Sequence, residues 1–150
     1  MRREARWNRL YEVAASQEGL FTTEQAAEAG YSPQLLIHHC RGGRVARIQR
    51  GIYRLVHFPV GEHSDLVAVW IWSARKGVVS HATALALHGL SDVLPSRIHL
   101  TLPAAWSSRR LRVPKSVTIH HADVPRGARA WFGAVPVTTV ARTLNDCAKD

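Results

Sequence analysis

The sequence predicts an α+β fold in two parts: a helical N-terminal part with a basic hairpin over residues 1–58, and a small mixed α/β part over residues 59–150. Two observations predict this fold. Thr22–Leu55 shows two short helical segments and then two short strands around a glycine turn, and Arg97–Leu102 alternates like a half-buried strand. Pro59–Gly61 marks the boundary. With 150 residues and 46% apolar residues, the chain has enough material for one ordinary domain or two small ones.

The chain begins with a predicted helix over residues 3–17. Its apolar residues recur at i, i+3, i+4 and i+7, which favours packing along one stripe. These residues are Trp7, Leu10, Tyr11 and Ala14. Gly19 ends this helix, Leu20 and Phe21 form a short apolar connection, and Thr22 or Thr23 caps a second helix that stops at Gly30.

A third helix is predicted from Pro33 to about Arg41, with Ser32 as its N-cap and proline in its first turn. At 100° per residue the helix has two faces. The face expected to pack on the preceding helices carries Leu35, Leu36, His39 and Cys40. The opposite, outward face carries Gln34, Ile37, His38 and Arg41.

A basic hairpin follows the third helix. Residues 44–49 and 52–56 read as strands around Gln49-Arg50-Gly51. Because an isolated hairpin is marginal in water, we expect it to pack on the helices through Val45, Ile48, Ile52 or Leu55. No acidic residue lies between Gly30 and Gly61. The basic side chains of the hairpin and its approach are Arg44, Arg47, Arg50 and Arg54.

Helix–turn–helix followed by a basic hairpin is the winged helix-turn-helix arrangement, which docks on duplex DNA. We expect Gln34, His38 and Arg41 to read bases, beside Ser32 and Ile37 on the same surface. Arg44, Arg47, Arg50 and Arg54 are the expected phosphate and wing contacts. The structural alternatives are a solvated helix face and arginines that discourage strand pairing at the ribbon edge.

The second part mixes helices and strands. Predicted helices cover residues 62–76, a segment after Ser80, and a segment after Thr138 or Thr139. In the last of these we expect the inward-facing residues to be Val140, Leu144 and Cys147. Predicted strands cover residues 97–102, 113–121 and 130–137, the last interrupted by Pro136. His81 and His88 share one helical face, where hydrogen-bonded structural roles are expected.

A second candidate basic patch lies in the loop between the first two of these strands. It consists of Arg109, Arg110, Arg112 and Lys115. No acid lies between Asp92 and Asp123. Trp106 beside these arginines fits a stacking contact with a base or partner, or a structural anchor.

Charge and composition favour a polyanionic partner. The chain has 20 Lys plus Arg against 11 Asp plus Glu, a formal charge of +9. No apolar run is long enough to span a membrane, and the N-terminus lacks the apolar region of a secretory signal. The two distant cysteines, Cys40 and Cys147, suggest no disulfide framework, so the expected location is a reducing cytoplasm.

Enzymatic and metal-binding alternatives have weaker support. The sequence lacks hydrolase, metalloprotease, P-loop and dinucleotide motifs, so we expect no enzyme activity and no cofactor. Acidic residues of the second part are scattered, whereas two-metal hydrolysis needs converging carboxylates. Cys40 with His38 and His39, or His120 with His121, offer zinc ligands, but adjacent side chains diverge and we expect no metal. A purely protein-binding module would leave the basic hairpin unexplained.

The chain also resembles a known family. The stretch TTEQAAEAGYSPQLLIHHCRGGRVARIQRGIYRL resembles the winged-helix domain of AbiEi-type antitoxins, and GVVSHATALALHGLSDVLPSRIHLTLP with VPVTTVARTLNDCA resembles the domain that follows it. The resemblance implies a component of a type IV toxin–antitoxin system in bacterial abortive infection, a phage defence. It further implies a winged helix that represses its own operon and a second domain that neutralises a nucleotidyltransferase-like toxin.

The resemblance sets the expected partners: double-stranded DNA of the protein's own operator, and a cognate toxin, bound by a monomer or weak dimer. The alternative is the DNA-binding module of a nuclease-like or other nucleic-acid-processing protein, since some relatives carry a nuclease-like domain after these blocks. The last predicted helix ends without a glycine or asparagine cap, so we expect the natural protein to continue. Leu35, Ile37 and the His38-His39 pair stand where relatives often carry arginine. Protonation of His38 and His39 would add phosphate contacts, so we expect stronger binding at lower pH.

Overall fold

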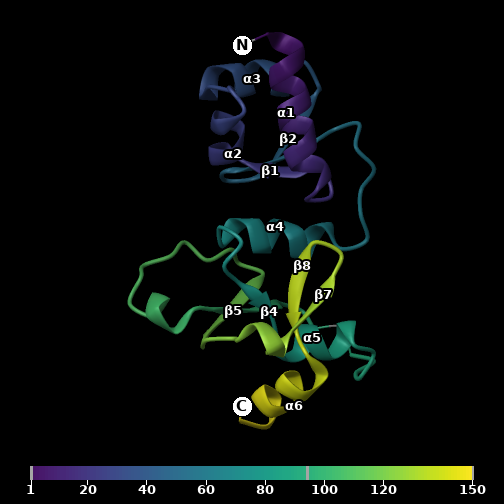
Figure 1. The fold of residues 1–150 in the computed structure, drawn as a ribbon, viewed down its shortest axis with the longest axis vertical. Helices are drawn as coiled ribbons and strands as arrows, with labels where there is room; N and C mark the ends of the chain where they lie inside the picture. Colours follow the sequence, from purple (N-terminus) through teal and green to yellow (C-terminus); the bar gives the residue numbers. More distant parts are fainter. Residues whose placement is uncertain (1, 94, 150) are drawn as a thin grey trace. The chain divides into compact units, whose positions relative to one another are not determined.

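The computed structural model describes residues 2–93 and 95–149, which form two compact units, Met1–Trp72 and Ser73–Asp150 (Figure 1). The outer limits of the two expected domains, residues 1 and 150, lie outside the described residues. The first compact unit runs beyond residue 58 because the helix that follows still contacts its sheet. A functional division between residues 58 and 59 stays a prediction. The α+β fold is confirmed.

Three helices and a small sheet form the first unit. The helices are α1 (Arg3–Ala15), α2 (Thr23–Glu28) and α3 (Pro33–Arg41). Thr22, not Thr23, caps α2: its hydroxyl accepts from the Gln25 backbone N–H at 3.1 Å, and the Gln25 side-chain oxygen accepts from the Thr22 N–H at 3.0 Å. This reciprocal capping box fixes where the helix–turn–helix begins.

The sheet of the first unit has three strands, in the order β1 (Leu20–Thr22), β3 (Ile52–Leu55) and β2 (Val45–Gln49). The segment expected to be a connection is therefore a strand, which gives the hairpin a third partner. One sheet face packs on the helices through a core of buried residues. Its largest members are Leu10, Phe21, Tyr31, Leu36, Val45 and Leu55.

The other face of this sheet is also covered. Leu20 pairs with Arg54, and Thr22 pairs with Ile52, so these residues share the face opposite Phe21 and Tyr53. Leu20 and Ile52 are buried. Helix α4 (Ser64–Trp72) contacts β1 and buries apolar residues on several sides, as its composition predicted. The expected packing of the hairpin is confirmed for Val45, Ile52 and Leu55, whereas Ile48 is 45% exposed.

The second unit is built on a five-stranded mixed sheet in the order β6-β5-β4-β8-β7. Its strands are β4 (Val78–Val79), β5 (Ile98–Leu102), β6 (Val117–His121), β7 (Arg129–Phe132) and β8 (Val135–Thr138). Helix α5 (His81–Leu87) contacts β5 and β8, and α6 (Val140–Lys149) contacts α5. Two single turns, η1 (Ala104–Trp106) and η2 (Arg126–Ala128), complete the unit.

Two expectations for the second unit are wrong. The single strand predicted over residues 130–137 is an antiparallel hairpin, because Gly133 with φ of 60° turns the chain between β7 and β8. In α6, Val140 and Leu144 face outward, 42% and 53% exposed. Helix α6 is instead oriented so that the Thr143 hydroxyl is buried. This hydroxyl lies 2.6 Å from the Thr138 hydroxyl and donates to the Thr139 carbonyl at 2.7 Å.

Candidate nucleic-acid interface

Helix α3 presents the outward face that the sequence predicts. Gln34, Ile37, His38 and Arg41 are exposed, and Leu36 is buried in the core. Ser32 caps the helix, since its hydroxyl accepts from the Leu35 N–H at 3.2 Å. The two-faced character of the helix is thus confirmed, and contact of the outward face with DNA stays a prediction.

The wing begins directly after α3. Strands β2 and β3 are joined by Arg50-Gly51, where Gly51 has φ of 76°, and the register shifts between Arg47 and Gln49. Arg47 and Arg50 are exposed. Arg47 pairs with Tyr53, whose ring stacks on Phe21 at 5.8 Å between centroids. The ribbon is therefore anchored through its aromatic residues, with two free guanidinium groups near its tip.

Arg54 differs from the other wing arginines. It lies on the central strand β3, on the opposite sheet face from Arg47, and it is half-buried. Its guanidinium donates to the Phe58 carbonyl at 3.3 Å. This bond gives Arg54 a structural role in holding the chain after β3, so its assignment as a DNA contact stays a prediction with less geometric support than that of Arg47 or Arg50.

Arg44 is positioned by an aromatic ring from another helix. Its guanidinium carbon lies 3.6 Å from the centroid of the Trp7 ring in α1. A cation over an indole face is held electrostatically, and the planar guanidinium keeps its edge donors available. Arg44 is therefore preorganised at the point where α3 ends and the wing begins.

A basic hollow lies between the N-terminal part of α1, helix α3 and the start of the wing. We call it the α1–α3 hollow. Its volume is about 350 Å³. The lining residues are Arg3, Arg6, Tyr31, Leu35, His38, His39, Gly42 and Arg44.

The α1–α3 hollow is electropositive. Burial, followed by the charges of Arg44, His38, Arg6 and Arg3, lowers the pKa of His39 below its usual value. Burial raises the pKa of Tyr31, against the opposing effects of Arg44 and Arg6, so its hydroxyl remains a proton donor at neutral pH. The sequence reasoning missed Arg3 and Arg6 as interface candidates. Arg3 and Arg6 are three residues apart in the sequence, and this spacing places both on one side of a helix.

The second basic patch is a surface loop. Arg109, Arg110, Arg112 and Lys115 are all exposed between η1 and β6. The Arg109 guanidinium carbon lies 4.2 Å from the centroid of the Trp106 ring. Trp106 thus already has a cation on one face. The patch is a cationic surface, and its contact with nucleic acid stays a prediction.

Three histidine side chains lie together in the second unit, a grouping that the sequence pattern does not predict. The rings of His81 and His120 are 3.6 Å apart, and Nδ1 of His99 lies 2.9 Å from Nε2 of His120. They come together because β5 and β6 pair in parallel while α5 begins beside β5, a register that sequence spacing does not reveal. His81 also lies within 2.8 Å of the Ser80 hydroxyl, and His88 within 2.7 Å of the Thr138 carbonyl. These contacts agree with the expected structural roles of His81 and His88.

The candidate zinc ligands are Cys40 with His38 and His39, and His120 with His121. Within residues 2–93 and 95–149, no group of three or more His, Cys, Asp or Glu side chains is placed to hold a metal ion. His38 is exposed while His39 and Cys40 are half-buried, and the rings of His38 and His39 meet edge to face with 5.3 Å between their centroids. His120 turns toward His81 and His99, while His121 is exposed.

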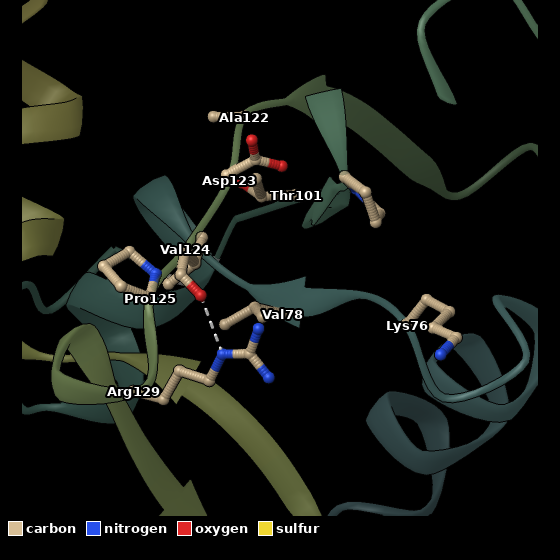
Figure 2. A pocket seen from close by; sticks show the side chains of 9 residues that line it. Lys76, Val78, Thr101, Ala122, Asp123, Val124, Pro125 and Arg129 are labelled. Carbon is tan, nitrogen blue, oxygen red and sulfur yellow. Dashed lines mark hydrogen bonds between the residues drawn. The ribbon is translucent and has the colours of Figure 1, made fainter. Parts of the chain in front are cut away.

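The second unit contains a smaller hollow of about 180 Å³ beside β4 and β5 (Figure 2). Its charged lining residues are Lys76, Asp123 and Arg129. Asp123 accepts from the Ala104 N–H at 3.1 Å, and Nε of Arg129 donates to the Val124 carbonyl at 3.0 Å, as Figure 2 shows for the arginine. Asp123 is the one carboxylate in this lining, and it is bonded to the backbone. Two-metal hydrolysis needs several carboxylates that converge on one point, and no group of three or more metal-binding side chains is found among the described residues.

One family model matches the N-terminal part of the chain. Residues 8–56 match the family model described as transcriptional regulator, AbiEi antitoxin. No curated protein matches the chain. Among solved structures, the RV2827C protein from Mycobacterium tuberculosis matches 77% of this chain at 21% identity, with a TM-score of 0.45. The match spans 44% of that chain. In the described part of the molecule, no helix combines the length and apolarity needed to cross a bilayer.

Proposed function

We propose that the protein is a DNA-binding autorepressor and the antitoxin of a type IV toxin–antitoxin system, because residues 8–56 match the family model described as transcriptional regulator, AbiEi antitoxin. The observation that carries the proposal is the exposed face of α3 beside a wing with two free arginines, in a stretch with no acid from residue 31 to residue 60. In this proposal the protein works in the cytoplasm, without a cofactor, as a monomer or weak dimer.

DNA recognition divides between helix and wing. Gln34, His38 and Arg41 would approach base edges in the major groove, with Ile37 available for a thymine methyl group. Ser32 holds the N-terminus of α3 in place, and Arg47 and Arg50 would contact phosphates or the minor groove. The basic loop that contains Arg109 would extend the footprint.

The antitoxin activity is assigned to the second unit, on the basis of its sequence resemblance to the domain that follows the winged helix in AbiEi-type proteins. Its partner would be a nucleotidyltransferase-like toxin. The exposed apolar residues of α6, Val140 and Leu144, lie on this unit and offer contact area for a protein.

Two binding measurements test the proposal. A gel shift with DNA from upstream of the gene should give a specific complex that persists against excess random duplex, and a pull-down should retain the product of the neighbouring gene. If the protein binds random duplex equally well, it is no operator-specific repressor. If it cleaves plasmid DNA in the presence of Mg²⁺, the alternative function in nucleic-acid processing replaces regulation.

A further inference from the structure

The α1–α3 hollow brings together basic side chains that the predicted DNA contacts only partly include. Arg3 and Arg6 project from α1, His38 and His39 come from α3, and Arg44 lies where the wing begins. Arg3, Arg6 and His39 were not among the expected contacts. These groups surround a volume of about 350 Å³, large enough to admit a phosphate group with part of its sugar.

No carboxylate lines the α1–α3 hollow. The nearest printed carboxyl group, Glu4, lines a neighbouring hollow that shares Arg3 and Arg44 with this one. Among the described residues, Arg3, Arg6 and Arg44 form no ion pair with a carboxylate, in contrast to Arg142, which pairs with Asp146 at 3.0 Å. Like charges held close together cost free energy, and an anion placed among them removes that cost. The pKa of His39 is lowered by burial first and by this positive field second.

Arg6 supplies a second, independent observation. Its Nε is buried and has no hydrogen-bond partner among the described residues. The guanidinium carbon lies 5.7 Å from the centroid of the Tyr31 ring, which restricts where the side chain can go. A buried donor without a partner costs free energy. A phosphate oxygen in the hollow would satisfy this donor through a charge-assisted bond.

The hollow adjoins the face expected to read DNA. His38 lines the hollow and also belongs to the exposed face of α3. Arg44, held over the Trp7 ring, connects the hollow to the wing. A duplex lying on α3 would therefore bring backbone phosphates past the mouth of the hollow.

We propose that the α1–α3 hollow is a phosphate-binding site that seats one backbone phosphate of the bound duplex, held by Arg3, Arg6 and Arg44. The identity of the duplex as ligand rests on the proposed function. The proposal adds α1 to the interface, outside the helix–turn–helix and the wing. A free phosphate would be recognised by the same groups, so the experiment separates the two sources.

The test compares Arg6→Met with Arg9→Met in the full chain. Both changes remove one charge from α1, but Arg9 is exposed and does not line the hollow. The probe is a fluorescent duplex of random sequence, because a phosphate contact carries no sequence information. Arg6→Met should weaken binding about tenfold and reduce the slope of log K against log salt by about one. Arg9→Met should change affinity by less than twofold.

The other outcomes are equally decisive. Equal losses in both variants, or no loss in Arg6→Met, overturn the proposal, because the charge of α1 would then act only as a diffuse field. If Arg6→Met fails to fold, as judged by thermal unfolding, the exposed Arg3 takes its place as Arg3→Met. If the native protein binds no duplex, the proposed function fails. A titration with inorganic phosphate then tests whether the hollow binds phosphate at all. Shifts of the His39 ring signals that disappear in Arg3→Met would establish a site for free phosphate, and their absence overturns the site.

Discussion

At the residue scale, we expect the wing to supply affinity and helix α3 to supply sequence specificity. Arg50 is exposed at the turn of the ribbon, and we expect it to contact the DNA backbone and not base edges in the major groove. We expect Arg50→Ala to weaken binding to operator and random DNA alike and to reduce the salt slope by about one. Gln34→Ala should instead lower the preference for operator by about 1–3 kcal/mol. Fluorescence anisotropy with both duplexes measures the two effects, and equal effects of both changes on both duplexes would contradict these roles.

We also expect His39 to make the affinity for DNA depend on pH. Its pKa in the free protein is lowered by burial and by Arg44, His38, Arg6 and Arg3, and Tyr31 and Trp7 pack against its ring. A phosphate in the hollow would raise that pKa, so binding would take up a proton. Affinity should therefore rise as the pH falls through about 6.5, the ordinary pKa of histidine, and level off only below it, where the lowered pKa of the free protein lies. The His39→Gln variant should show a smaller rise. A flat profile for the native protein would refute the linkage.

At the element scale, the capping of α2 gives a stability prediction. Thr22 accepts from the Gln25 N–H and Gln25 returns the bond, whereas Thr23 makes no such cap in the structure. Thr22→Ala should lower the free energy of unfolding by about 1 kcal/mol. Thr23→Ala removes the same hydroxyl one residue later and serves as the control, with an expected change within about 0.5 kcal/mol. Urea unfolding followed by circular dichroism measures both. A larger loss in Thr23→Ala would show that the cap is misassigned.

The elements also show which features the sequence could predict. Local signals placed α3 and the wing correctly: Ser32 and Pro33 begin the helix, and Arg50-Gly51 turns the ribbon. The rotation of α6 was predicted wrongly, because its apolar stripe suggested an inward face that the buried Thr138–Thr143 hydroxyl pair overrides. Specific buried hydrogen bonds of this kind depend on tertiary neighbours, which periodicity does not report.

At the scale of the whole molecule, the sequence pattern does not predict which side chains from distant segments lie together. Arg6 and His39 meet only because α1 packs against α3, and His99 meets His120 only because two strands pair in one register. Each histidine or arginine by itself is an ordinary surface residue. The exposed face of α3 could be predicted from one helix, whereas the α1–α3 hollow required the packing of two.

The extent of the DNA-binding unit is a further prediction at this scale. Helix α4 contacts β1, and the sheet face with Leu20 and Ile52 is buried. A chain cut after residue 58 would uncover that face, and each exposed aliphatic side chain loses about 1.5–3 kcal/mol of burial. We therefore expect residues 1–72 to unfold cooperatively and bind duplex DNA, and residues 1–58 to show no cooperative transition. Thermal unfolding and amide proton dispersion by NMR compare the two fragments. A cooperatively folded 1–58 fragment with full DNA affinity would show that α4 belongs functionally to the second part of the chain.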